Sequence, residues 1–211
     1  MKDMTLYINC CVRKESRTNR LAKAVLQKLG EDYTELKLYE ENLRPLDLEK
    51  LNRRTELIER GDFSDKMFDC AKQFANADTI MIATPYWDLS FPAPLKNYIE
   101  NIYVTGIVSA YIENGLPVGL CKANDLYYVT TAGGPYDPTY SYGYIESLAK
   151  NFFGIPKTHL VKAEMLDLNY SCTSETASAN GCALSDINIT DILQSFPPKK
   201  GALLPWGSDN F

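Results

Sequence analysis

The sequence predicts an α/β protein in which five parallel strands form a doubly wound sheet with helices on both faces. Short segments with the composition of strands alternate along the chain with segments of helical apolar periodicity. One segment, 80–83, is a continuous apolar run, which is typical of a central strand buried on both faces. The length of 211 residues suits one such domain with a sizeable core.

The expected strands share an enrichment in β-branched and aromatic residues, and most end at polar or glycine-containing segments. They span 4–9, 33–38, 78–84, 126–131 and 159–165.

Helices are expected where apolar residues recur every three or four positions. These segments span 21–29, 48–60, 64–75, 94–102 and 144–152. Gly30 fits the end of the first helix, Ser64 is a candidate N-cap, and Pro94 suits a first helical turn. The section 106–124 is expected to leave the sheet and run over its top, with a hairpin as a candidate form.

One domain is expected over residues 1–196, followed by an extended C-terminal tail over 197–211. A final helix within 171–196 is left open, because Gly181 interrupts the pattern. The tail carries Trp206, so it is expected to dock either on its own domain or on a partner.

Composition and charge exclude several classes of function. The 22 basic and 27 acidic residues give a net charge of −5, which argues against a nucleic-acid partner. No apolar run is long enough to span a bilayer, and no signal-peptide pattern opens the chain, so a cytoplasmic protein without membrane contact is expected. The six cysteines include no C-x-x-C pair, which favours reduced, mostly inert thiols over a metal site.

The segment after the first strand has the features of an anion site. Ser16, Thr18 and Asn19 are capping candidates, and a helix start with free N–H groups favours negative charge. Arg13 and Arg17 add positive charge to the same segment. The alternative is an ordinary capped helix with solvated charges.

Two further strand-to-helix loops have the features of a ligand site. The loop 85–92 is stiffened by proline and carries Trp87, which suits a wall for a flat ligand. The loop 132–138 contains Gly133 and Gly134, which permit close approach of the backbone, although a plain turn explains them equally well.

All three loops are expected at one edge of the sheet, because the carboxyl ends of parallel strands lie on the same side and form the usual ligand site. Together the three loops favour a flat ligand that carries a phosphate at one end. The first loop is neither G-x-G-x-x-G nor a P-loop, so a monophosphate such as that of FMN fits better than a dinucleotide.

Three segments then resemble a known family: 11–19, 85–89 with 94–96, and 130–136. Over about residues 4–166 the chain resembles flavodoxin-like FMN-dependent NAD(P)H:quinone oxidoreductases and azoreductases. The resemblance implies a flavodoxin-like fold and bound FMN. The FMN-binding residues that it implies are Cys11, Arg13, Ser16, Thr18, Asn19, Pro85, Tyr86, Trp87, Asp88, Leu89, Thr131, Ala132, Gly133, Gly134 and Tyr136.

The resemblance also implies ping-pong hydride transfer from NADH or NADPH to a quinone, azo compound or related aromatic acceptor. The flavin does the chemistry, so the protein need supply only position and electrostatics. Tyr136 is the one candidate for a catalytic side chain, and the sole histidine, His159, is expected to be structural. A homodimer is implied, with the segment 103–111 as a possible partner surface or, equally, an intramolecular cover.

Other functions remain as alternatives. A flavodoxin-type electron carrier is expected to have a Thr-x-Thr-Gly phosphate loop and a more acidic docking face than a net charge of −5 provides. An iron–sulfur flavoprotein requires a compact cysteine cluster that the sequence lacks. A flavin-binding module or sensor without turnover is the third alternative.

Overall fold

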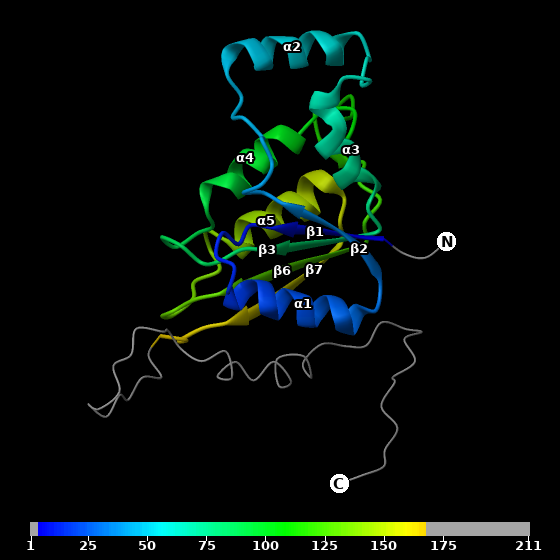
Figure 1. Ribbon diagram of the computed structural model, residues 1–211. Helices are drawn as coiled ribbons and strands as arrows, with labels where there is room; N and C mark the ends of the chain where they lie inside the picture. The colour runs from blue at the N-terminus through cyan, green and yellow to red at the C-terminus, as the bar shows by residue number, and fades with distance from the viewer. Residues whose placement is uncertain (1–3, 168–211) are drawn as a thin grey trace, which may run out of the picture.

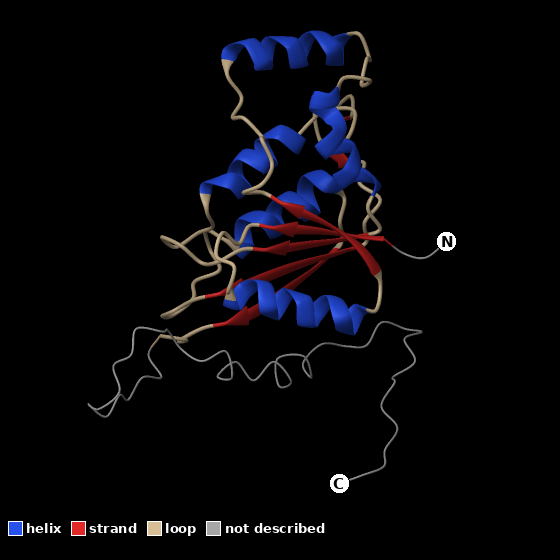
Figure 2. Ribbon diagram, in the orientation of Figure 1, coloured by secondary structure: helices blue, strands red, loops and turns tan. Residues whose placement is uncertain are grey.

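A five-stranded parallel sheet forms the centre of the protein, in a computed structural model that describes residues 4–167 (Figures 1 and 2). The strands lie in the order β2-β1-β3-β6-β7. Their bounds are β1 Met4–Asn9, β2 Asp32–Lys37, β3 Thr79–Ala83, β6 Asp125–Thr131 and β7 Lys157–Ala163. The expected fold class is therefore confirmed. The predicted β7 was placed two residues too far along the chain.

Helices cover both faces of the sheet (Figure 1). The bounds are α1 Arg17–Leu29, α2 Leu48–Glu59, α3 Asp69–Asn76, α4 Ala93–Ile102 and α5 Tyr142–Leu148. One buried cluster joins α1 to the strand side chains of one face, including Tyr7 and Met81. The other joins α3, α4 and α5 to the opposite face, including Ile8 and Ile82. Alternate residues of one strand thus reach opposite cores.

The register aligns the carboxyl ends of the central strands. Asn9 pairs with Ala83, Ala83 pairs with Val129, and Thr131 pairs with Ala163. Pairing continues beyond the strands, since Tyr86 N donates to Thr131 O at 3.1 Å. The loops after β1, β3 and β6 therefore leave the sheet at one edge, as expected from parallel topology.

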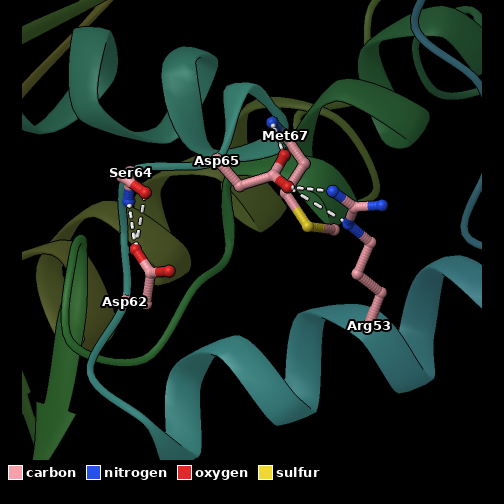
Figure 3. A network of polar contacts seen from close by, with 5 residues as sticks. All are labelled: Arg53, Asp62, Ser64, Asp65 and Met67. Atoms are coloured by element: carbon pink, nitrogen blue, oxygen red, sulfur yellow. Dashed lines mark hydrogen bonds and ion pairs between the residues drawn. The ribbon is translucent and has the colours of Figure 1, made fainter.

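The start and end of α1 follow the sequence signals. The side chain of Ser16 accepts a hydrogen bond from Asn19 N at 3.2 Å, and Gly30 adopts a left-handed conformation with φ of 66°. The predicted cap of the later helix is wrong by one residue. Asp65 caps the short 3₁₀ turn η1 (Lys66–Phe68), while Ser64 N and Oγ both donate to Asp62 (Figure 3).

Helix α2 stands away from the sheet and has no buried residue (Figure 1). Lys50 anchors it to α4 by donating to Asn101 Oδ1 at 2.5 Å. Arg53 adds an ion pair with Asp65 beyond the end of the helix (Figure 3). These polar contacts add to a small apolar contact between α2 and the core. No helix in residues 4–167 has the length and apolar character to cross a membrane.

The section 106–124 forms the expected hairpin, from β4 (Ser109–Tyr111) and β5 (Pro117–Gly119). It is held against the helical layer, since Lys122 N donates to Ala75 O and Cys121 N to Phe153 O. Phe153 is the last residue of the π-helical turn η2 (Ala149–Phe153). Within 103–111, Val104 and Val108 are buried, which favours the intramolecular cover.

His159 lies on β7 and stacks on Tyr127, with ring centroids 4.5 Å apart. Its Nε2 is 2.7 Å from Asp125 Oδ1, at the edge of the sheet where the strands begin. These contacts are consistent with the expected structural role of His159. The possible helix within 171–196 and the tail 197–211 lie outside the described residues.

Candidate functional site

A cleft of about 230 Å³ lies at the carboxyl edge of the sheet. Three loops and the segment after β7 form it. Its lining residues are Cys11, Val12, Arg13, Glu15, Ser16, Arg17, Thr18, Pro85, Tyr86, Trp87, Thr131, Gly133 and Asp167. The three loops that the sequence predicts to meet are therefore brought together.

The N-terminus of α1 provides one end of the cleft. The amides of Arg17 and Thr18 lie in the first turn, before Arg20 N, which makes the first intrahelical hydrogen bond to Ser16 O, and both residues line the cleft. The first turn contains no acidic residue that would neutralise the helix dipole. The guanidinium of Arg17 and the neighbouring Arg13 make this end suitable for an anion.

A buried hydrogen bond joins the start of α1 to the end of β6 beneath the cleft. The hydroxyl groups of Thr18 and Thr131 are 2.7 Å apart, and both residues are buried. Asn19 is turned away, since its Oδ1 accepts a hydrogen bond from Tyr7 OH at 2.7 Å. The two threonines therefore fix the helix terminus relative to the sheet, whereas the Asn19 side chain supports the core below.

Cys11 lines the cleft as a neutral thiol. Burial raises its pKa to about 11, and its Sγ lies 3.8 Å from Ala83 O. The neighbouring Cys10 is fully buried, and burial raises its pKa to about 12. Neither group is a thiolate near neutral pH, so neither is suited to nucleophilic chemistry there.

The loop after β3 forms an aromatic wall. Trp87 lines the cleft and is 40% exposed, so it does not belong to the core. Trp87 and Ser90 exchange two backbone hydrogen bonds, of 3.0 and 2.8 Å, around Asp88 and Leu89. Both intervening residues have positive φ, of 50° and 65°, as in a type I′ turn. Leucine adopts this conformation at a cost, which is a local strain next to the cleft.

Two hydrogen bonds and one aromatic contact fasten this aromatic wall to the loop after β6. Ser90 Oγ donates to Tyr140 O at 2.7 Å, and Tyr86 OH accepts from Asp137 N at 3.3 Å. The rings of Tyr86 and Tyr136 pack edge to face with centroids 4.8 Å apart. The wall is thus held from behind by a second loop.

Tyr136 lies behind Tyr86 and does not line the cleft. Its hydroxyl is 2.9 Å from Ser141 Oγ, and burial raises its pKa above the ordinary tyrosine value. The Lys162 ammonium lies 5.5 Å from the centre of its ring. This arrangement suits a residue that positions Tyr86 better than one that donates a proton to a ligand.

Gly133 is the residue of the third loop that lines the cleft. A Cβ atom built on it would collide with Oδ2 of Asp167, so the space left by the missing side chain is taken by a carboxylate. A Cβ atom built on Gly134 would meet nothing within 4 Å, and Ala132 is buried. The two consecutive glycines therefore have different surroundings.

Most of the residues predicted for the site line the cleft. The predicted residues outside the lining are Asn19, Asp88, Leu89, Ala132, Gly134 and Tyr136. Four lining residues were not among the predicted ligands: Val12, Glu15, Arg17 and Asp167. The first three belong to a loop that sequence reasoning had found, whereas Asp167 follows β7 and no local signal marks it.

We expect Thr18→Val to lower the free energy of unfolding by about 1–3 kcal/mol, because it leaves the buried Thr131 hydroxyl without its partner. The double variant with Thr131→Val should recover part of that loss, since it removes both polar groups. Urea denaturation of the wild type and the three variants measures the coupling. Strict additivity of the two single effects would contradict the proposed interaction.

Comparison with known proteins identifies the family. A family model of the flavodoxin-like fold matches residues 4–179. An azoreductase structure from Bacillus anthracis shares the fold with a TM-score of 0.68 and 24% identity, over 79% of this chain and 88% of that chain.

Two curated relatives are named as FMN-dependent NADH:quinone oxidoreductases. The protein from Coprothermobacter proteolyticus is 34% identical over 166 residues, covering 74% of this chain and 82% of that protein. The one from Clostridium acetobutylicum is 34% identical over 177 residues, covering 77% and 86%. With its parallel sheet and the cleft at the carboxyl edge, the chain therefore belongs to the flavodoxin-like family of FMN-dependent NADH:quinone oxidoreductases.

Proposed function

We propose that the chain binds FMN in this cleft and reduces quinones, azo compounds or related aromatic acceptors at the expense of NADH or NADPH. The observation that carries the proposal is the meeting of three features in one cleft. They are the cationic N-terminus of α1, the aromatic wall at Tyr86 and Trp87, and the glycine at 133. The names of the curated relatives support the same activity.

The residues present fit a flavin monophosphate. We assign the phosphate to the N-terminus of α1, where Ser16, Arg17 and Thr18 meet and Arg13 lies nearby. The volume of about 230 Å³ is below the roughly 300–1,000 Å³ typical of small-molecule sites. Asp167 lines the cleft with its carboxylate over Gly133, so displacement of this side chain would enlarge the cleft.

We assign the ring to the aromatic wall. Pro85, Tyr86 and Trp87 line the cleft together with Thr131 and Gly133. The tight turn at Asp88 and Leu89 fixes the direction of the backbone beside that wall. Four residues predicted to bind FMN lie outside the lining, and we propose that they support it from outside: Asn19, Asp88, Leu89 and Tyr136.

The bound flavin would supply the redox chemistry by accepting a hydride from the nicotinamide and passing reducing equivalents to the acceptor. The chain supplies position and charge. We expect the two reactants to use the same open side of the cleft in turn, which is a ping-pong order. The thiol of Cys11 and the phenol of Tyr136 both have raised pKa values, so neither is expected to act as a base.

Gly133→Val should weaken FMN binding by roughly tenfold or more, because a branched side chain would enter the cleft. Gly134→Val is the matched control, since a Cβ there meets nothing within 4 Å. Quenching of flavin fluorescence by the full chain measures both affinities. Equal affinities for the two variants would show that the third loop does not line the FMN site.

Turnover separates the enzyme from an electron carrier or a flavin-binding module. We expect the FMN-loaded chain to oxidise NADH or NADPH much faster with menadione than without it. Initial rates at several menadione concentrations should give parallel double-reciprocal lines, as a ping-pong order requires. A flavin-loaded chain with no acceptor-dependent oxidation of either nucleotide would rule out the enzyme function.

We further propose that the protein is a homodimer in the cytoplasm. The hairpin region exposes Tyr111, Ile112, Leu116, Val118 and Leu120, each between 41% and 58% exposed, which is a candidate surface for a second copy. Among residues 4–167 the four cysteines, Cys10, Cys11, Cys70 and Cys121, are free thiols, which suits a reducing compartment.

Sedimentation equilibrium should therefore give twice the chain mass of 23.8 kDa. Leu116→Asp should shift the equilibrium to monomer, because it places a charge in the apolar surface. Leu48→Asp on α2, where the leucine is 74% exposed, is the control. A wild-type monomer at micromolar concentration would contradict the dimer.

A further inference from the structure

A carboxylate lies inside the cleft to which we have assigned an anionic cofactor. Asp167 follows β7, and its backbone N donates to Gly133 O at 2.9 Å. The preceding residue, Leu166, is tied to Ala132 O by a longer hydrogen bond of 3.3 Å. The loop after β6 therefore fixes the position from which the Asp167 side chain enters the cleft.

This carboxylate pairs with the cation at the start of α1. Arg17 Nη2 lies 2.8 Å from Asp167 Oδ1, and Arg17 Nη1 donates to Leu166 O at 3.3 Å. The second carboxylate oxygen lies over Gly133, in the space that a side chain there would occupy. The ion pair thus crosses the cleft from the helix terminus to the third loop.

The pair is held weakly enough for a ligand to replace it. The Asp167 side chain is 65% exposed, and exposed ion pairs contribute little to stability. A phosphate dianion carries more charge than a carboxylate and can accept two parallel hydrogen bonds from a guanidinium. At the N-terminus of α1 it would also accept hydrogen bonds from the backbone amides.

We propose that Asp167 competes with the phosphate of FMN for Arg17, and so sets the affinity of the cleft for phosphorylated over unphosphorylated flavin. This inference rests on the proposed function. Binding of the phosphate requires Arg17 to exchange its carboxylate partner for the ligand. The free energy of that exchange, together with repulsion between two anions, subtracts from the affinity for FMN. Riboflavin has no phosphate, so it does not incur this cost.

Replacing Asp167 tests the competition directly. In the full-length, flavin-free chain, Asp167→Asn should tighten FMN binding by roughly fivefold, because the amide holds Arg17 less strongly and does not repel phosphate. Riboflavin affinity should stay within about twofold. Flavin fluorescence titration measures both ligands. Asp69→Asn is the matched control, since Asp69 is also 65% exposed and pairs with Lys72 on α3, outside the cleft.

The same substitution in a chain that already lacks the Arg17 guanidinium shows whether the effect of Asp167 on FMN affinity depends on Arg17. With Arg17→Gln already present, Asp167→Asn should change FMN affinity by clearly less than it does in the wild type. FMN binding that is unchanged or weaker in Asp167→Asn, in a variant with wild-type thermal stability, would overturn the inference. An equal gain for riboflavin would overturn it as well. A wild-type chain that binds neither flavin would instead overturn the proposed function.

Discussion

The parallel register of the central strands is the constraint on which the site depends. Because Asn9, Ala83 and Val129 lie in register near the carboxyl ends of β1, β3 and β6, three loops that are far apart in sequence leave the sheet side by side. The pairing of Tyr86 N with Thr131 O extends the ladder into two of these loops. The cleft is therefore positioned by the same hydrogen bonds that hold the sheet together, and it needs no separate scaffold.

Position and charge, and not reactive side chains, distinguish this cleft. Its thiol at Cys11 is protonated, and the phenol of Tyr136 lies behind the wall. What remains is a helix terminus, two guanidinium groups, the carboxylates of Glu15 and Asp167, an aromatic face and a glycine. That set suits a protein that holds a redox cofactor and leaves the chemistry to it. The buried pair of Thr18 and Thr131 keeps the helix terminus aligned with the sheet.

Local signals in the sequence were sufficient for the fold and for most of the cleft. Apolar periodicity located the strands and helices, and Ser16 and Gly30 marked the ends of α1 because capping depends on neighbouring residues alone. Sequence could not separate Thr18, whose hydroxyl faces Thr131, from Asn19, whose amide faces Tyr7. Both have polar side chains in the same helical turn, and only tertiary packing decides which one points at the cleft.

Tertiary contacts also explain the residues that the sequence did not reveal. Leu89 adopts a left-handed conformation that its side chain disfavours, so no turn signal predicted the tight turn at 88–89. Asp167 reaches the cleft because the segment after β7 pairs with residues 132–134, which is a long-range contact. Its presence changes the explanation of Gly133, whose missing side chain makes room for a carboxylate of this chain as well as for a ligand.

A crystal structure of the full chain grown with FMN would show directly whether this cleft holds the cofactor. We expect the phosphate at the N-terminus of α1, within hydrogen-bonding distance of Arg17 and the Thr18 amide, with the ring against Trp87. FMN bound with its phosphate remote from α1, or with its ring away from the loop at 85–87, would show that the cleft is not the FMN site proposed for it.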